Sequence, residues 1–231
     1  MIPDLGASFA YRLRVSARSR LGLARGRGSA TGSVGAAVAW LLVEGGHGEL
    51  AIEAETVEVR GRQDVFGSPG WSVLLAPGTR FAVRGDLRYA IVGRAWSGDV
   101  ETRVLRPRAV VVERRGKGPD ERVVRTYIGN GPLICGESLT QPGRWSSWPP
   151  HRYEHEEVAL FRLDPPHGFG VQILDVERGG RRADVVTDGD VRRIRAGFHS
   201  VAAAPGAVMC SLWVLAGEST SLAPELEPDF T

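Results

Sequence analysis

One short segment, WPPHRYEHEE, carries four side chains that could bind a metal ion or move a proton. His151, Tyr153, His155 and Glu157 stand at every second position, directly after the Trp-Pro-Pro lead-in. Alternate side chains of an extended strand point to the same face, so this spacing predicts that the four converge on one side. Two imidazoles and a carboxylate are accepted ligands of first-row divalent metals. A further histidine, His199, lies in a glycine-flanked turn downstream and could complete the site from a neighbouring strand.

The segment is also typical of a charged, solvated strand, because histidine and glutamate are common on protein surfaces. His199 on its own would be equally unremarkable. Their joint placement is more specific, since a small barrel turns side chains into its mouth at a strand and a turn of this kind. We therefore interpret His151, His155, Glu157 and His199 together as a candidate metal site.

The elements that must position these residues are predicted to be strands throughout. The 30 glycines and 14 prolines are spread along the chain and mark many turns. Between them lie short apolar and β-branched runs of strand length, among them GELAIEA, GWSVLLAPG, EEVALFRL and FGVQILDVE. No window holds a convincing helical stripe. The sequence therefore predicts an all-β sandwich or barrel.

A weak internal duplication divides the chain. Residues 70–83 resemble residues 188–203, since each has a glycine-led strand, a turn with glycine and a second strand. The second copy carries His199 in its turn, whereas the first has Thr79 and Arg80 in the equivalent region. We therefore expect two similar barrels in tandem. They are a degenerate, structural domain over residues 1–104 and a domain with the metal site over residues 105–231.

Composition and charge limit the classes of partner and the cellular compartment that the sequence favours. The 29 basic and 27 acidic residues give a net charge of +2, which argues neither for nor against a polyanionic partner. Six arginines lie between Arg12 and Arg27, but RLRVSARSRL alternates with period two and lacks interleaved aromatics, which favours an exposed, solvated strand over a nucleic-acid patch. Cys135 and Cys210 form no CxxC motif, which fits a reducing compartment. Without a secretory signal or an apolar run of ~20 residues, we expect a cytoplasmic protein with no nucleic-acid or membrane partner.

Three longer strings resemble a known family. They are GESLTQPGRWSSWPPH, EEVALFRLDPPHGFGVQILD and DGDVRRIRAGFHSVAAAPG. They are similar to the 5-deoxy-glucuronate isomerases of bacterial inositol catabolism, relatives of the 4-deoxy-threo-hexosulose-uronate ketol-isomerases. The resemblance is dense over residues 122–217 and weaker upstream. It implies a bicupin, all-β with two tandem cupin-type β-sandwich barrels, and a metal-dependent aldose–ketose isomerase that converts a uronic acid substrate, 5-deoxy-glucuronate, to 5-dehydro-2-deoxy-gluconate.

The family's metal site carries over onto this chain with one departure. The resemblance implies that its first histidine is His151, its glutamate is Glu157 and its late-turn histidine is His199. The ion would be divalent, zinc or manganese by preference, and such ligands also accept iron or nickel. The family's second histidine falls on Tyr153, whose neutral phenol is a poor ligand. Either His155 takes the vacant position, which we favour, or the site keeps three ligands.

The catalytic groups are less well marked. Glu137, in the family-like GES motif, and Tyr153 are candidates for the general base that moves a proton between adjacent carbons, although each residue type is also typical of a structural role. Arg125, in a family-like strand, is the candidate for binding the substrate carboxylate. Trp145 and Trp148 are expected to wall the pocket.

Two alternatives stay open beside the isomerase. A diverged bicupin would bind a metal or a sugar acid without turnover. Three departures from the family support this alternative: Tyr153, Arg195 where the family has proline, and a C-terminus that matches the family tail only in PDF. A cupin oxygenase using iron is less favoured, because the family strings extend well beyond the ligands. Edge strands of such barrels often pair between subunits, so a homo-oligomer is a further alternative.

Overall fold

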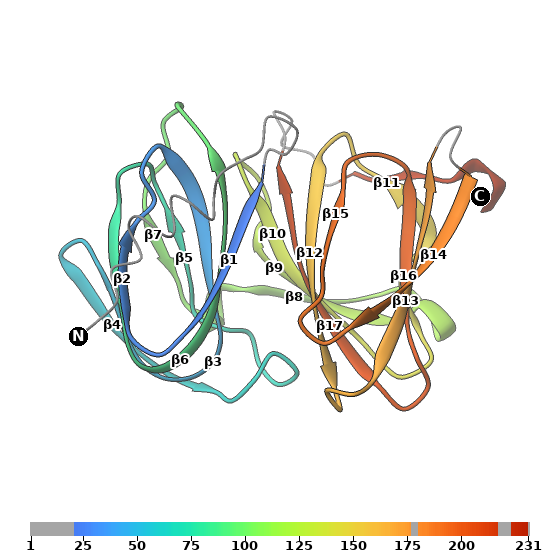
Figure 1. Ribbon diagram of the computed structural model, residues 1–231, viewed down its shortest axis with the longest axis horizontal. Helices are drawn as coiled ribbons and strands as arrows, with labels where there is room; N and C mark the ends of the chain where they lie inside the picture. Colours follow the sequence, from blue (N-terminus) through green and yellow to red (C-terminus); the bar gives the residue numbers. More distant parts are fainter. Residues whose placement is uncertain (1–20, 177–179, 217–222, 231) are drawn as a thin grey trace. The chain divides into compact units, whose positions relative to one another are not determined.

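The computed structural model describes residues 21–176, 180–216 and 223–230 (Figure 1). Over these residues the chain consists of β-strands and short 3₁₀ turns, with no α-helix. The prediction of an all-β chain is therefore confirmed. Nothing helical in the described segments has the length and apolar character needed to cross a membrane.

Two compact units make up the chain, residues 1–110 and residues 111–231, called unit 1 and unit 2 below. The boundary expected at 104/105 falls a few residues before the observed one. Most of the arginine-rich segment that was expected to form an exposed strand, residues 12–20, lies outside the described residues. The last part of the arginine-rich segment from Arg12 to Arg27 forms the strand β1 (Gly22–Arg27), where Arg27 is exposed and pairs with Asp86 at 3.3 Å.

Unit 1 is an antiparallel sheet of seven strands. Their order is β1-β6-β3-β5-β7, with β2 also paired to β6 and β4 to β3. The long strands β3 and β6 have 16 residues each and run side by side along most of their length. The strands are β1 (Gly22–Arg27), β2 (Ala30–Ser33), β3 (Ala37–Ile52), β4 (Glu55–Arg62), β5 (Ser72–Leu75), β6 (Arg80–Ala95) and β7 (Arg103–Leu105), followed by the 3₁₀ turn η1 (Pro107–Ala109).

Apolar side chains fill the interior of unit 1. The buried cluster includes Val43, Phe81, Leu87 and Tyr89, and burial of each such side chain stabilises the fold by about 1.5–3 kcal/mol. Tyr89 lies directly across from Gly26 in the β1–β6 ladder. A Cβ atom on Gly26 would collide with the Tyr89 ring, so glycine is what allows the ring to lie there.

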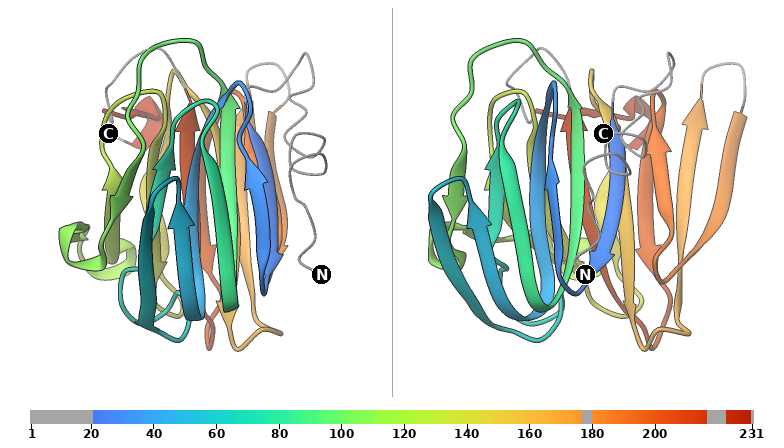
Figure 2. Two further views of the ribbon diagram at one scale, coloured as in Figure 1. Left: turned by 90° about the vertical axis from the view of Figure 1, so that its left-hand side faces the viewer. Right: turned by 60° about the vertical axis from the view of Figure 1, so that its left-hand side comes forward.

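Unit 2 is a sandwich of two antiparallel sheets. The first has the order β15-β12-β17-β10-β9-β8 and the second β14-β13-β16-β11-β18. The paired strands β13 and β14, in orange, are seen in the right-hand view of Figure 2. The elements are β8 (Val111–Arg115), η2 (Gly118–Asp120), β9 (Arg122–Ile128), β10 (Ile134–Thr140), β11 (Trp145–Arg152), β12 (Glu156–Asp164), β13 (Phe169–Val176), β14 (Gly180–Thr187), β15 (Val191–Ile194), β16 (Phe198–Ala203), β17 (Val208–Ala216), β18 (Glu225–Leu226) and η3 (Pro228–Phe230).

The pairing scheme of unit 1 recurs in unit 2. Strands β10 and β11 pair with β17 and β16, as β1 and β2 pair with the two halves of β6. Strands β12 and β13 pair with β17 and β16 in turn, as the two halves of β3 pair with β6. The segments in which the sequence indicates a duplication, residues 70–83 and 188–203, form the β5–β6 and β15–β16 connections.

Candidate functional site

A pocket of about 150 Å³ lies inside unit 2 and is lined by residues from both of its sheets. Four of the residues singled out in the sequence line it: His151, Tyr153, Glu157 and His199. Nε2 of His199 lies 3.1 Å from Oε2 of Glu157. The rings of His151 and His199 are 4.5 Å apart between centroids, and Tyr153 packs edge-on against His151 at 5.3 Å. The structure thus brings these four side chains together.

Strand pairing and a change of sheet produce this convergence. His151 and His199 are directly opposite each other in the β11–β16 ladder, in one sheet. Glu157 comes from β12, in the other sheet. The expectation of one continuous strand from His151 to Glu157 is therefore wrong, because β11 ends at Arg152 and the chain turns before β12 begins. The side chains meet across the sandwich interior instead of along one strand face.

The Trp-Pro-Pro sequence forms a bulge that shapes the pocket. The β11–β16 register runs normally to Ser146 opposite Val201 and then jumps to His151 opposite His199. Proline has no N–H to contribute to a ladder, which explains why the strand leaves its partner here. The bulge places Trp148 and Pro149 in the pocket wall.

The ionisable groups of the pocket have shifted pKa values. Burial, together with the nearby His199, lowers the pKa of His151 to about 4, although Glu157 and backbone hydrogen bonds oppose the shift. Burial alone would raise the pKa of Glu157, but His199 and His151 bring its net value below the ordinary one. Burial, with Glu157, raises the pKa of Tyr153. At neutral pH the pocket therefore holds a carboxylate, a neutral His151 and a protonated phenol.

The donor types fit a divalent metal ion. Two ligands bound to one ion at ~2.1 Å and at right angles lie about 3 Å apart, which is close to the separation of His199 Nε2 and Glu157 Oε2. The other nitrogen of His199, Nδ1, is buried and has no hydrogen-bond partner in the described part of the chain. His151 has backbone hydrogen bonds to Ser147 and Pro149. Within the described ranges, however, no three or more His, Cys, Asp or Glu side chains are already arranged as a metal site.

His155 is not among the residues that line the pocket. It is buried in the turn between β11 and β12. A continuous strand would have placed it on the same face as His151 and Glu157, but the turn does not. The structure thus places Tyr153 in the pocket and His155 outside it. This geometry favours the three-ligand alternative over His155 as a substitute ligand.

Arg125 and Glu137 form a structural pair outside the pocket. They lie opposite each other in the β9–β10 ladder, are almost fully buried, and approach to 3.2 Å. Tyr127 donates a further hydrogen bond to Glu137 at 3.0 Å. Their neighbours Val124 and Ser138 line the pocket, so the alternation of strand side chains turns Arg125 and Glu137 to the opposite face. This placement corrects the expectation that they meet the substrate.

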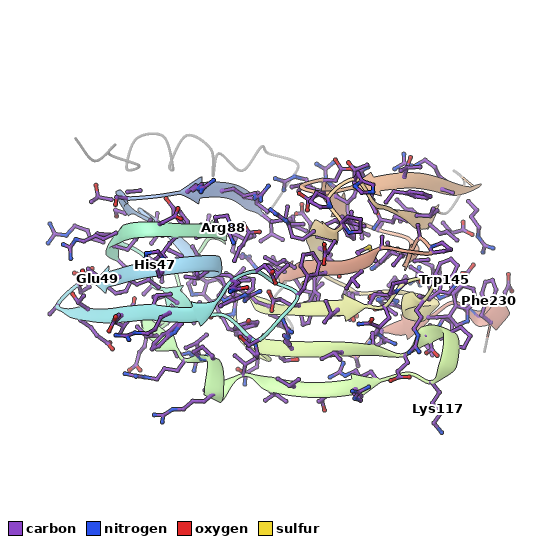
Figure 3. The ribbon with its side chains drawn as sticks, turned by 90° about the horizontal axis from the view of Figure 1, so that it is seen from below. His47, Glu49, Arg88, Lys117, Trp145 and Phe230 are labelled. Carbon is purple, nitrogen blue, oxygen red and sulfur yellow. The ribbon has the colours of Figure 1, made fainter. Side chains whose placement is uncertain are left out.

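The sequence reasoning missed two groups that do line the pocket. One is a pair of arginines, Arg115 and Arg122. Arg122 is on the same strand as Arg125 but an odd number of residues away, and therefore on the pocket face. The other is the C-terminal segment, where Leu226 pairs opposite His151 and lines the pocket. Phe230 packs against Trp148 at 5.1 Å, and Trp148 against Trp145 at 4.9 Å. Figure 3 shows Trp145 and Phe230 together at this end of unit 2.

Comparison with known proteins agrees with this picture. The model of the KduI/IolB family matches residues 10–231. The 5-deoxy-glucuronate isomerase of Geobacillus thermodenitrificans is 31% identical over 185 residues, 73% of this chain and 68% of the relative. The enzyme of the same name from Geobacillus kaustophilus is 31% identical over 209 residues, 83% of this chain and 76% of the relative.

Solved structures show the same fold. An IolB-like protein from Salmonella typhimurium superposes with a TM-score of 0.86 at 25% identity and covers 91% of this chain and 88% of its own. A cupin 2 conserved barrel domain protein from Leptotrichia buccalis (TM-score 0.51, 15% identity, 85% and 83% coverage) shares the fold alone. So does Bacillus subtilis oxalate decarboxylase, in a structure concerned with its Mn(II) centres (TM-score 0.60, 10% identity, 90% and 71% coverage).

The fold is thus that of tandem cupin-type β-sandwiches, as the sequence predicted. The named relatives are isomerases, and this chain is accordingly an enzyme of the isomerase class. The strings that carried the resemblance lie on β10 to β16, around the pocket. Because the family model spans all but the first nine residues, this chain belongs to the KduI/IolB family.

Proposed function

We propose that this chain is a metal-dependent aldose–ketose isomerase that converts 5-deoxy-glucuronate to 5-dehydro-2-deoxy-gluconate in myo-inositol catabolism. One observation carries the proposal. His151, Glu157 and His199, which are donors suited to a divalent ion, line one pocket of a chain whose relatives are named 5-deoxy-glucuronate isomerase. In this proposal unit 1, with its apolar interior, has a structural role.

His151, Glu157 and His199 would hold the ion, zinc or manganese by preference, and the Mn(II) centres of oxalate decarboxylase support metal use in this fold. A bound divalent ion would draw electron density from the substrate carbonyl and the adjacent hydroxyl, which acidifies the hydrogen on the carbon between them. The low pKa of His151 keeps its imidazole neutral and its lone pair available. Apolar walls, including Trp148 and Trp213, would exclude bulk water.

The isomerisation moves one proton between neighbouring carbons and one between their oxygens, so it needs no external oxidant or reductant. Tyr153 is the remaining candidate for handling a proton, since Glu137 faces away from the pocket. The raised pKa of Tyr153 keeps its hydroxyl protonated, so it would act first as a hydrogen-bond donor to a substrate oxygen.

Product formation from 5-deoxy-glucuronate, followed by NMR on metal-loaded protein of measured metal content, tests the proposal. We expect turnover that depends on the ion and is lost when a chelator removes it. Metal-loaded protein with no turnover would contradict the isomerase assignment.

A second candidate is a diverged cupin that binds a metal or a sugar acid without turnover. The observation that favours it is Tyr153, which lines the pocket at the position of the family's second histidine. Binding of ion and sugar acid in the absence of any product or of proton exchange into the sugar would establish this alternative.

A further inference from the structure

The β8–β9 hairpin brings two arginines together at the pocket. Arg115 and Arg122 lie directly opposite each other in the β8–β9 ladder, and both line the pocket. Like charges in directly opposed positions of an antiparallel pair destabilise each other. The repulsion has to be offset by acidic neighbours or by a bound anion.

Acidic neighbours offset it unevenly. Arg115 is about half exposed and pairs with Glu113 at 2.6 Å. Arg122 is largely buried, with 14% of its side chain exposed, and its ion pair with Asp120 is long at 3.8 Å. One terminal nitrogen of Arg122 donates to the main-chain carbonyl of Asp120 at 2.9 Å, whereas its buried Nε has no hydrogen-bond partner among the described residues. The charge of Arg122 is therefore only partly compensated.

The electrostatic environment of Arg122 points the same way. Burial lowers the pKa of its guanidinium, and Arg115 lowers it further, while Asp120 acts in the opposite direction. An anion placed between the two arginines would offset the cost of burying Arg122 and the repulsion between the two guanidinium groups, because it would interact favourably with both charges.

The pocket lining carries two groups of ionisable side chains that lie apart, because Glu157 on β12 and Arg122 on β9 are separated in one sheet by β17 and β10. One end, called the histidine end, is formed by His151, Glu157 and His199. The other, called the arginine end, is formed by Arg115 and Arg122. Tyr153 also lines the pocket, and its ring packs against that of His151. A ligand that spans the pocket would therefore place oxygens at the histidine end and a negative group at the arginine end.

We propose that Arg122, assisted by Arg115, binds the carboxylate of an open-chain sugar acid whose carbonyl lies at the histidine end. This inference rests on the proposed isomerase function, in which carbonyl and carboxylate stand at opposite ends of the substrate. A guanidinium presents paired N–H donors that match the two oxygens of a carboxylate. The arginine end would thus select acids over neutral sugars and fix which end of the chain reacts.

Kinetics with an acidic and a neutral aldose test this subsite. Wild type, Arg122→Met, Arg122→Lys and Arg114→Met are compared with 5-deoxy-glucuronate and with 5-deoxy-glucose, in which an alcohol replaces the carboxylate. Arg114 is the matched control, because it stands beside Arg115 on β8, is 79% exposed and does not line the pocket. We expect Arg122→Met to raise KM for the acid about 10- to 100-fold, with little change for the neutral sugar or in metal content. Arg122→Lys should recover part of the loss.

Binding without turnover keeps the test independent of the isomerase reaction. Calorimetry uses D-glucuronate, D-glucose and inorganic phosphate as probes. A preference for glucuronate over glucose that is lost in Arg122→Met and kept in Arg114→Met supports the subsite, even if wild type forms no product and the isomerase proposal fails. The subsite is overturned if wild type shows no such preference, if Arg122→Met retains it, or if phosphate binds more tightly than glucuronate.

Discussion

In unit 1 the interior is packed with side chains such as Phe81, Leu87 and Tyr89, whereas the interior of unit 2 holds a pocket of about 150 Å³ with ionisable groups. The two units share one pairing scheme, so strand topology does not cause the difference. In unit 2 the buried apolar cluster, which includes Phe161 and Met209, occupies part of the sandwich beside the pocket. A few positions therefore decide whether the interior of such a β-strand unit becomes an apolar core or a functional site.

The turn between β5 and β6 in unit 1, which corresponds to the turn between β15 and β16 in unit 2, is one such position. In unit 2 the β15–β16 turn leads into His199, which is buried in the pocket. In unit 1 the β5–β6 turn leads through Thr79, whose hydroxyl lies 2.7 Å from that of Thr102, to an exposed Arg80. The single histidine of unit 1, His47, is exposed on β3 (Figure 3).

The strongest test of this contrast removes the turn residue in each unit. His199→Ala should lower metal affinity and kcat/KM by at least about 100-fold, because it takes away a donor that contacts Glu157 at 3.1 Å. Thr79→Ala should cost unit 1 about 1 kcal/mol of stability and leave metal content unchanged. His155→Ala, outside the pocket, should also retain the metal. Metal analysis of the three purified variants checks this, and metal loss in His155→Ala would restore it as a ligand.

Aromatic rings over glycines offer a second, smaller test. Gly136 on β10 lies opposite Trp213, and a Cβ there would collide with the Trp213 ring, as a Cβ on Gly26 would with Tyr89. We expect Gly136→Ala and Gly26→Ala each to lower the free energy of unfolding by about 1–3 kcal/mol in denaturant melts.

Only one of the two substitutions should affect the site. Trp213 lines the pocket and donates to Ser138 at 3.1 Å, so moving its ring changes the pocket wall. Tyr89 belongs to the apolar core of unit 1. Gly136→Ala should therefore raise KM as well as destabilise, while Gly26→Ala should affect stability alone. An equal change in KM for both variants would show that Gly136 has no specific role in shaping the pocket wall.

The sequence predicted the all-β fold and the convergence at the histidine end of the pocket, but not the other pocket-lining groups or the placement of His155. Strand-length runs between glycine and proline turns gave the all-β class, and His151, Glu157 and His199 do converge. The direction of side chains in fully buried strands was not predictable. Strand β9, RVVRTYI, is buried to some degree on both faces, so hydrophobic alternation could not show that Arg122 faces the pocket and Arg125 does not.

Substitutions of Tyr153 show how far one pocket residue determines the metal affinity and the activity of unit 2. Tyr153→His restores the family's second histidine in the pocket wall and should raise metal affinity about 10-fold, or ~1.4 kcal/mol. Tyr153→Phe keeps the ring against His151 but loses the hydroxyl, so it should retain the metal and lower kcat. Equilibrium dialysis with the ion, and kinetics on both variants, measure these effects. Loss of metal in Tyr153→Phe would instead make the phenol a ligand.

The C-terminal segment provides the smallest effect. Its strand β18 pairs with β11 and helps to line the pocket of unit 2. Arg152 donates to both carboxylate oxygens of Glu225 at 2.8 Å, and the Glu227 N–H donates to the Pro150 carbonyl at 2.8 Å. Hydrogen bonding from Arg152 lowers the pKa of Glu225 below its ordinary value of 4.5.

A lowered carboxylate pKa fixes the sign of the pH dependence. The contribution of the Arg152–Glu225 pair is fully present above pH 4.5, the ordinary pKa, and is lost as the pH falls through the lowered value. Because Glu225 is exposed, the effect should be modest and salt-sensitive. The protection of the Glu227 amide against hydrogen exchange should fall in acid in wild type, relative to the protection of amides in the β3–β6 ladder of unit 1. In Glu225→Gln this protection should already be lower at neutral pH, and it should change less as the pH falls. Identical pH profiles in the two proteins would show that the ion pair does not hold β18 against β11.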